Sequence, residues 1–221
     1  MASAVDNRGA YGVLCALPAE LGSWAGMGDL ISVEGGLELR RLLVGDEVLF
    51  TCVSGVGKVA ATRAAEGLIR AGADKALFIV GTCGSLGRGI VPGTLVHCSL
   101  AVQADLAVRQ GRVSNPDPTL LAAWEASAPG SRAVYLTSDR AVFNPWRRFW
   151  VRRRQSGPCV AEMETAAAAA CAEAWGVPWV ALRSVTDGAG WGALRAFKKR
   201  YPVEAGRAAD TVTGLLSLIG A

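Results

Sequence analysis

The sequence CVAEMETAAAAACAEAWGVPWVALRSVTD, residues 159–187, combines an apolar run, an alanine-rich helix and a second apolar run. The first run ends at Glu162, the helix closes at Gly176, and the second run, over 179–182, leads into Arg183. This order predicts a strand–helix–strand unit of the kind that builds α/β proteins. Ligands of open α/β sheets lie at the carboxyl ends of the strands. The charged residues that follow the two runs are therefore the first candidates for a functional site.

The rest of the chain continues this alternation of strands and helices. Apolar runs that predict strands lie at 11–17, 37–43, 48–54, 76–80, 94–102 and 133–136. Helical patterns lie at 18–27 and 58–71, after Asn115, after Pro145 and, as a closing amphipathic helix, at 203–218. A chain of 221 residues is long enough for one large domain. We therefore expect a single α/β domain over residues 10–221, preceded by a polar, flexible tail over residues 1–9.

Glycines follow two of the predicted strands. Gly81-Thr82-Cys83-Gly84 comes directly after the run at 76–80, and we expect a turn that brings the Thr82 hydroxyl and free N–H groups to a ligand. Ser54–Val59 resembles a Walker A loop only in part. Cys52 stands where that loop needs glycine, and Val59 stands where it needs Ser or Thr. A phosphate-binding loop of this type is therefore excluded.

Composition excludes several classes of protein. Apolar residues make up 51% of the chain and charged residues 19%, but no apolar run reaches the roughly 18–20 residues of a membrane span. The N-terminus lacks a signal-peptide core, and the net charge of +4 is too small to indicate nucleic acid. The six cysteines form no C-x-x-C pair, and with the single His97 they fit no familiar zinc site. We expect a cytoplasmic protein with buried, reduced thiols and neither a membrane nor a nucleic-acid partner.

An arginine-rich segment follows Asn144. Five arginines alternate with Trp146, Phe149 and Trp150 over residues 145–154, a composition that also occurs in nucleic-acid-binding proteins. The spacing of the three aromatic residues instead favours the apolar stripe of a short helix. We expect the arginines to be solvated, or to serve a subunit contact or an anionic tail of a substrate. A lone histidine in a strand, such as His97, is expected to be structural.

Five separated motifs together resemble the nucleoside phosphorylase and nucleosidase superfamily, and most of all the 5′-methylthioadenosine/S-adenosylhomocysteine nucleosidases. Their order and spacing fit that family over nearly the whole chain. The resemblance implies a single α/β domain with a mixed, partly barrel-like central sheet flanked by helices. It also implies a homodimer or higher homo-oligomer that needs neither cofactor nor metal. The motifs are Ala16-Leu17-Pro18-Ala19-Glu20, Ser54-Gly55-Val56-Gly57-Lys58-Val59-Ala60-Ala61, Gly81-Thr82-Cys83-Gly84, Glu162-Met163-Glu164-Thr165-Ala166-Ala167 and Arg183-Ser184-Val185-Thr186-Asp187.

The resemblance also implies residue roles on the sugar and at the attacking water. Glu164 resembles the carboxylate that accepts hydrogen bonds from the ribose hydroxyls, and Met163 packs against the sugar. Glu20 resembles the base that positions the water, with Thr82 and Arg183 around it. Gly84, Glu162 and Phe143 complete the implied contacts with substrate. Each residue also has a structural alternative, such as a helix N-terminal carboxylate for Glu164, an exposed helix residue for Glu20 or a salt-bridge partner for Arg183.

Asp187 resembles the acid that protonates the purine at N7, and its structural alternative is a helix or turn cap. Breaking an N-glycosidic bond produces a cationic sugar and an anionic base, so an acid with a raised pKa helps the base to leave. Carboxylates near the sugar stabilise the positive charge, and a further carboxylate can deprotonate water. The resemblance therefore implies hydrolysis of a purine nucleoside, a small-molecule substrate.

Departures from the family pattern leave alternatives open. Phosphorylases hold phosphate with arginines where this chain has Ile79 and Glu20, so hydrolysis is favoured over phosphorolysis. Ala141 stands where methylthioadenosine enzymes have an aromatic residue near the base, and Phe143 is a possible substitute. The segment Gln103-Ala104-Asp105-Leu106 resembles futalosine hydrolases instead. A futalosine hydrolase, a phosphate-dependent phosphorylase and a catalytically silent nucleoside-binding protein are the alternatives.

Overall fold

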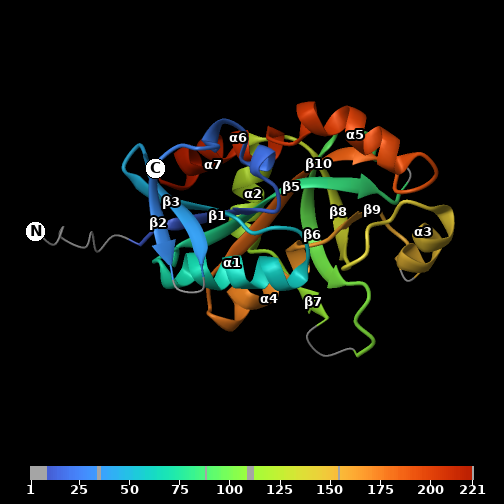
Figure 1. Cartoon of the computed structure of the whole chain (residues 1–221), viewed down its shortest axis with the longest axis horizontal. Helices are drawn as coiled ribbons and strands as arrows, with labels where there is room; N and C mark the ends of the chain where they lie inside the picture. Colours follow the sequence, from blue (N-terminus) through green and yellow to red (C-terminus); the bar gives the residue numbers. More distant parts are fainter. Residues whose placement is uncertain (1–8, 34–35, 88, 109–111, 154, 221) are drawn as a thin grey trace, which may run out of the picture.

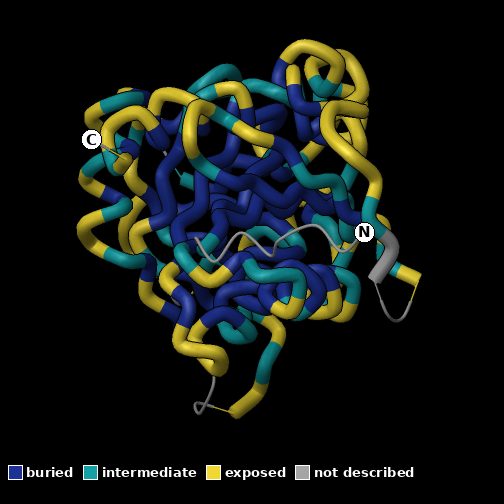
Figure 2. The backbone as a smooth tube through the Cα atoms, turned by 90° about the vertical axis from the view of Figure 1, so that its left-hand side faces the viewer, coloured by how far each residue is buried: buried dark blue, intermediate teal, exposed yellow. Residues whose placement is uncertain are grey.

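The computed structural model describes residues 9–220 apart from 34–35, 88, 109–111 and 154 (Figure 1). Of the predicted tail over residues 1–9, only Gly9 lies within the described residues. The described chain alternates strands and helices, as expected. Buried segments run through the middle of the molecule, and exposed segments lie around them (Figure 2).

Four parallel strands form the centre of the sheet. They are β1 (Tyr11–Cys15), β4 (Glu47–Val53), β5 (Ala76–Ser85) and β10 (Trp179–Asp187). β1 pairs with both β4 and β5, and β10 pairs with β5 on its other side. All residues of β1 and β10 are buried, because helices or other strands cover both faces of a parallel sheet. The parallel order brings the carboxyl ends of β1, β5 and β10 to one edge.

The sheet closes on itself on one side. β10 pairs with β6 (Leu95–Gln103), β6 with β8 (Ser131–Thr137), β8 with β9 (Cys159–Glu162), and β9 returns to β5. This circuit mixes parallel and antiparallel pairs and confirms the expected mixed sheet that partly forms a barrel. Beyond β4, the antiparallel strands β3 (Leu37–Val44) and β2 (Asp29–Val33) extend the sheet, and β7 (Val113–Ser114) pairs with β6.

Helices cover both faces of the sheet. In Figure 1, α1 (Lys58–Arg70) and α4 (Thr165–Ala174) lie below it and pack against each other. On the other side, α2 (Pro118–Ser127) packs against α7 (Val212–Ile219), and α6 (Arg207–Asp210) packs against the 3₁₀ helix η1 (Pro18–Trp24). α5 (Ala193–Glu204) follows β10, and α3 (Pro145–Arg152) projects at one end.

The prediction of one closing helix over 203–218 is wrong, because α5, α6 and α7 share that stretch. The chain bends at Gly206, where it passes directly over Gly22 of η1. A Cβ at Gly206 would lie 2.4 Å from the Cα of Gly22, so this crossing requires glycine. The helical periodicity of the sequence could not reveal a contact between segments so far apart.

The predicted glycine turn at residues 81–84 is also wrong, because β5 continues through it to Ser85. The two glycines make room for side chains from other elements. A Cβ at Gly81, whose φ is +148°, would lie 2.9 Å from Arg183 Nη1 and 3.0 Å from Glu20 Oε1. A Cβ at Gly84 would lie 3.0 Å from Asp187 Oδ1. At Gly81 and Gly84, strand β5 therefore has no side chain to obstruct Arg183, Glu20 and Asp187, which approach it from other elements.

His97 and the cysteines occupy the interior. His97 lies on β6, where its Nε2 is 2.8 Å from the Ala128 carbonyl oxygen and its Nδ1 has no partner among the described residues. Burial lowers the pKa of His97, so the ring is kept neutral, in agreement with a structural role. The six cysteines carry free thiols and all but Cys171 are buried, as expected. Within the described residues, the search for a helix long and apolar enough to cross a membrane found none.

Candidate active site

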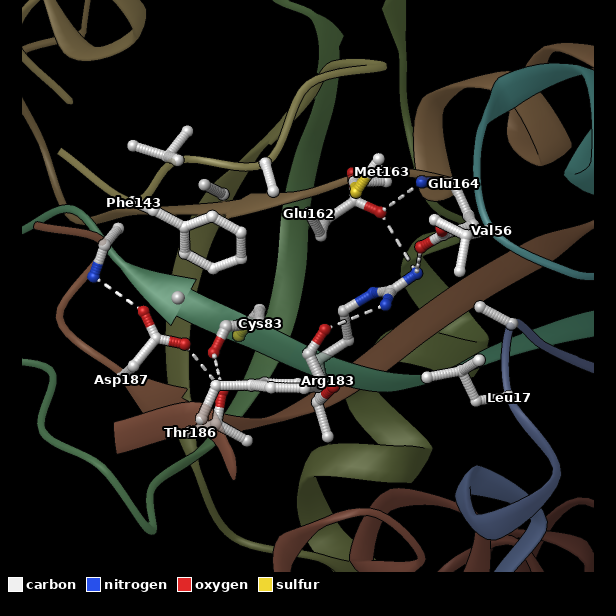
Figure 3. A pocket seen from close by; sticks show the side chains of 18 of the residues that line it. Leu17, Val56, Cys83, Phe143, Glu162, Met163, Glu164, Arg183, Thr186 and Asp187 are labelled. Carbon is white, nitrogen blue, oxygen red and sulfur yellow. Dashed lines mark hydrogen bonds and ion pairs between the residues drawn. The ribbon is translucent and has the colours of Figure 1, made fainter. Parts of the chain in front are cut away.

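A pocket opens at the edge of the sheet where β1, β5, β9 and β10 end (Figure 3). The structure brings together there all nine residues singled out from the sequence, which are Glu20, Thr82, Gly84, Phe143, Glu162, Met163, Glu164, Arg183 and Asp187. Asp187 and Phe143 lie at one end of the pocket, and Glu164 and Val56 lie at the other. Arg183 lies between these ends, beneath the pocket. The walls are otherwise largely apolar.

Glu162 is the last residue of β9, and both of its carboxylate oxygens contact groups of the protein. Its Oε2 accepts hydrogen bonds from the backbone N–H groups of Glu164 and Thr165, at 2.9 and 2.7 Å, and thus caps the start of α4. Its Oε1 accepts a hydrogen bond from the Thr137 hydroxyl of β8. Oε2 also lies 3.0 Å from Arg183 Nη2. Glu162 therefore fixes the start of α4, and its own oxygens are occupied by protein donors.

Glu164 is the N-cap residue of α4, yet its side chain makes no capping hydrogen bond. Its Oε1 accepts a hydrogen bond of 3.0 Å from the N–H of Gly57, at the start of α1, and its Oε2 accepts one of 3.2 Å from Arg183. Burial raises the pKa of Glu164 to about 7, although the Arg183 charge opposes the shift. The simple capping role proposed as an alternative belongs to Glu162 instead, so Glu164 retains capacity to accept further hydrogen bonds.

Arg183 is 2% exposed and is surrounded by protein acceptors. It pairs with Glu162 at 3.0 Å and Glu164 at 3.2 Å, and it donates to the carbonyl of Thr82 at 2.9 Å and to the Thr165 hydroxyl. Burial alone would lower the pKa of Arg183, but the surrounding carboxylates raise it, so the guanidinium stays charged. This arrangement fits the salt-bridge alternative for Arg183. The Arg183 guanidinium therefore holds the Glu162 and Glu164 carboxylates in place.

Glu20 is 2% exposed and accepts four hydrogen bonds. Oε2 accepts from the N–H groups of Ala16 and Leu17, both at 3.1 Å, where β1 passes into η1. Oε1 accepts from the N–H of Thr82 at 2.9 Å and from its hydroxyl at 2.8 Å. A carboxylate has about four lone-pair sites, so a water can bind Glu20 only if a donor leaves. The Thr82 hydroxyl is the one donor of the four that can rotate away.

Asp187 is 5% exposed and ends β10. Its Oδ1 accepts a hydrogen bond of 2.7 Å from the N–H of Ala189, and its Oδ2 lies 2.8 Å from the Thr186 hydroxyl oxygen. Burial raises the pKa of Asp187, although these two contacts oppose the shift. The Thr186 hydroxyl also lies 3.2 Å from the carbonyl oxygen of Cys83. Since a hydroxyl has one hydrogen, it can donate to Cys83 and accept from a protonated Asp187.

Sequence reasoning missed several residues that line the pocket. Val56 and Thr186 lie inside motifs quoted above, so their neighbours could have indicated them. Phe197, on α5, and Arg140, between β8 and α3, belong to no motif, and only the fold brings them to the pocket. The missed lining residues are Ala16, Leu17, Val56, Cys83, Arg140, Val142, Ala161, Thr186, Ala189 and Phe197. Ala141, which the resemblance places near the base, also lines the pocket. Ile79, used above to argue against phosphate, is buried in the core and does not line the pocket.

The predicted aromatic stripe on α3 forms, but it does not pack on the core. Trp146 stacks on Phe149, and Trp150 meets both rings edge to face. The three side chains are 70%, 61% and 44% exposed, in the order Trp146, Phe149 and Trp150. Asp105, from the segment resembling futalosine hydrolases, pairs with Lys58 Nζ at 2.8 Å and accepts from the Asp139 N–H outside the pocket. A search of the described residues for three or more His, Cys, Asp or Glu able to hold a metal found no such group.

Comparisons with known proteins identify the family and the fold. A family model of the phosphorylase superfamily matches residues 10–217. A search of curated proteins found no significant match. Among solved structures, the 5′-methylthioadenosine/S-adenosylhomocysteine nucleosidase of Helicobacter pylori, bound to butyl-thio-DADMe-Immucillin-A, is 20% identical with a TM-score of 0.89 and covers 96% of this chain and 99% of its own.

Two further solved structures extend the comparison. The S-adenosylhomocysteine nucleosidase of Streptococcus pyogenes, in complex with 5-methylthiotubericidin, is 21% identical with a TM-score of 0.87, over 96% of this chain and 98% of its own. The futalosine hydrolase of Helicobacter pylori is 20% identical with a TM-score of 0.88, over 95% and 97%. At these identities the structures establish a shared fold.

Proposed function

Since the chain belongs to the phosphorylase superfamily, we propose that it hydrolyses the N-glycosidic bond of a 5′-modified purine nucleoside of the methylthioadenosine or S-adenosylhomocysteine type. The observation that carries the proposal is the pocket itself. Asp187, whose pKa burial raises, lies at one end and Glu164 at the other, and Glu20 lines the pocket with a Thr82 hydroxyl that can rotate away. This arrangement supports the roles of acid, sugar-binding carboxylate and base that we propose for them.

The purine occupies the end formed by Asp187 and Phe143. Burial raises the pKa of Asp187 and so favours its protonated form, which delivers its proton to N7 of the base as the glycosidic bond breaks. The Thr186 hydroxyl and the Ala189 N–H hold the carboxyl group in one orientation. Ala141 stands where methylthioadenosine enzymes have an aromatic residue near the base. Phe143, which is 40% exposed, supplies an apolar face for the base instead.

The ribose lies against Met163 and Glu164. Glu164 accepts hydrogen bonds from the sugar hydroxyls, while Gly57 and Arg183 keep its carboxylate in place. Positive charge develops on the sugar as the base departs, and Glu164 and Glu20 stabilise that charge because they are preorganised and buried. Arg183 and Glu162 act as positioning residues, since their polar groups are bound to the protein.

The nucleophile is a water molecule at Glu20. When the Thr82 hydroxyl rotates away from Oε1, a water takes its place and gives its proton to Glu20 as it attacks C1′ of the sugar. The remaining three donors, all backbone N–H groups, keep the carboxylate aimed at the pocket. One water is consumed, and the products are the free base and the free 5′-modified sugar.

The charge of the pocket favours water over phosphate. With Asp187 protonated, the three other carboxyl groups, those of Glu20, Glu162 and Glu164, still outnumber the two guanidinium groups that line the pocket, those of Arg140 and Arg183. Arg183 is already paired with two of these carboxylates. A phosphate dianion would meet net negative charge with no free arginine on the floor of the pocket, whereas an oxocarbenium-like sugar is stabilised there.

Futalosine is the second candidate substrate. Its support is Arg140, which lines the pocket and whose guanidinium has no partner among the described residues, and the structural likeness to a futalosine hydrolase. An unpaired guanidinium at a pocket wall suits a substrate that carries a carboxylate. The segment Gln103–Leu106 gives this candidate no further support, because Asp105 is bound to Lys58 and the Asp139 backbone.

We also propose that the enzyme is cytoplasmic and acts as a homodimer or larger homo-oligomer. Free, buried thiols support a reducing compartment. Val56, just before α1, lines the pocket yet is 52% exposed, and Val59, in the first turn of α1, is 76% exposed. An apolar surface continuous with the pocket is the kind of surface that a second subunit covers.

Base release from a set of nucleosides tests the proposed activity. We expect turnover of one 5′-modified nucleoside among methylthioadenosine, S-adenosylhomocysteine and futalosine, with weaker turnover of adenosine and inosine, because only the former fill the pocket beyond the sugar. The measurement is free base by chromatography over time. Binding of these nucleosides without release of base from any of them would favour the catalytically silent protein.

A further inference from the structure

Arg148 of α3 connects the two loops that follow β5 and β10. Its Nη1 donates a hydrogen bond to the carbonyl of Gly188, and its Nη2 donates one of 3.1 Å to the carbonyl of Leu86. These carbonyls come directly after the strand ends that carry Asp187 and Ser85. Arg148 is half-buried, while α3 contains no buried residue. The Arg148 guanidinium thus links the exposed helix α3 to the two loops beside Asp187.

The loop that Arg148 holds is strained. Ala189 has a φ of +47°, and it is the one described non-glycine residue with positive φ. That conformation is unfavourable for an L-residue and persists only where neighbouring contacts impose it. Ala189 is 1% exposed, lines the pocket and donates its N–H to Asp187 Oδ1 at 2.7 Å. The strained residue therefore supplies one of the two contacts that orient the Asp187 carboxyl group.

We propose that Arg148 is a positioning residue for the acid, because it anchors the Gly188 carbonyl and so holds Ala189 in the conformation that orients Asp187. The inference rests on the proposed function for its effect on catalysis. Gly188, whose carbonyl accepts the Arg148 hydrogen bond, lies between Asp187 and Ala189 in the chain. The hydrogen bond therefore acts at the centre of the turn. A Cβ at Gly188 or at Gly190 would lie 3.9 Å from Arg148 Nη1, so both glycines lie close to the guanidinium.

Few other groups compete for this role. The Thr186 hydroxyl contacts Asp187 Oδ2 from β10, Cys83 lies beneath on β5, and Arg200 of α5 acts on Asp187 only through its charge. None of the three contacts the Gly188 carbonyl among the hydrogen bonds of the described residues. Arg147, the neighbour of Arg148, donates instead to the Arg140 carbonyl and the Ser138 hydroxyl. Among the described residues of α3, Arg148 is thus the one that donates a hydrogen bond to the turn.

Replacing Arg148 tests the proposal through kinetics. We expect Arg148→Met to lower kcat by about 10- to 100-fold, the scale of a misplaced catalytic group, with KM changed less than about threefold. Losing the Ala189 N–H contact raises the pKa of the acid further, so the alkaline limb of the pH profile of kcat/KM moves to higher pH. Arg148→Lys, which keeps one charged donor, should recover part of the loss.

The matched control is Arg153→Met, which removes a charge at the end of the same helix. Arg153 stacks 4.0 Å above the Trp150 ring and contributes nothing to the pocket of Asp187, so kcat should change by less than about twofold. A loss of kcat in Arg148→Met without movement of the alkaline limb would contradict the proposal. Equal losses in Arg153→Met and Arg148→Met would also contradict it, because the charge of α3 would then be the cause.

Hydrogen exchange separates this inference from the proposed function. The Ala189 amide of the full-length protein should exchange faster in Arg148→Met than in the parent, because the turn opens more often. This readout does not need turnover of any nucleoside. Unchanged protection of Ala189 would overturn the role of Arg148 even in an active enzyme. Faster exchange in Arg148→Met than in the parent, together with a parent that releases no base, would support the anchor and contradict the proposed reaction.

Discussion

Asp187→Asn should lower the rate of base release by about 10²- to 10⁴-fold, the usual contribution of a general acid. Asparagine has the shape of aspartate and can still accept the Ala189 N–H and contact the Thr186 hydroxyl. It has no proton to give to the leaving base. Substrate binding should therefore persist while bond cleavage is lost.

The pH dependence gives the control for this variant. Burial raises the pKa of Asp187, so the parent loses its proton, and its activity, as the pH rises through that pKa. The residual activity of Asp187→Asn should lack this alkaline limb. A buried carboxyl with a raised pKa destabilises the fold once it is ionised, so the variant should melt no lower than the parent at pH 8. Near-parental turnover, or a limb that persists, would remove Asp187 as the acid.

Glu20→Gln should abolish hydrolysis to a similar degree, about 10²- to 10⁴-fold, with a smaller loss of binding. An amide cannot accept the proton of the attacking water. It also replaces one acceptor oxygen by an NH₂ group, so at least one of the N–H groups of Ala16, Leu17 and Thr82 loses its partner. We expect this to lower the free energy of unfolding by about 1–3 kcal/mol. Steady-state kinetics and urea unfolding measure the two effects separately.

Glu204→Gln is the matched control for the loss of a buried carboxylate. Glu204 is 9% exposed and accepts hydrogen bonds from the Ser184 hydroxyl and from Arg207, outside the pocket. It should cost stability without changing kcat by more than about twofold. Unchanged turnover in Glu20→Gln would mean that water is activated elsewhere. Glu20 would then have a structural role, in which it accepts hydrogen bonds from Ala16, Leu17 and Thr82 and holds the start of η1 against β5.

The sequence was most informative at the ends of strands. Glu162, Glu164 and Asp187 could be singled out because ligands of α/β sheets lie at the ends of strands. The structure brings them together by mixed pairing, since β9 runs antiparallel to β5 and β10 runs parallel to it, and both ends meet β5 near Gly84. Glu20 and Thr82 could be added only through the resemblance to a family, since the residues around each of them allow a plain helix or a plain turn. The pocket contains all five.

Roles within the site were harder to predict than membership of it. Glu162 and Glu164 are separated by one residue, and nothing in the sequence distinguishes a cap from a ligand carboxylate. The structure distinguishes them by partners, because Glu162 binds the N–H groups of Glu164 and Thr165 while Glu164 binds Gly57 of another helix. Such partners come from tertiary packing. Local patterns therefore could not assign them.

Errors in the predicted elements have the same origin. Gly81 and Gly84 have the composition of a turn, but their missing side chains serve Arg183, Glu20 and Asp187, which arrive from elsewhere. The aromatic residues of α3 have the spacing of a core stripe, yet they remain exposed because α3 projects from the body of the molecule. Periodicity reports which residues share a face. It does not report what covers that face.

Product analysis in the presence of phosphate tests the central claim most directly. With the best nucleoside as substrate, the sugar product is identified by mass spectrometry, with and without saturating phosphate. The charge of the pocket leads us to expect free 5′-modified ribose at the same rate in both conditions. Formation of a sugar 1-phosphate, with turnover only when phosphate is present, would contradict the account and make the protein a phosphorylase.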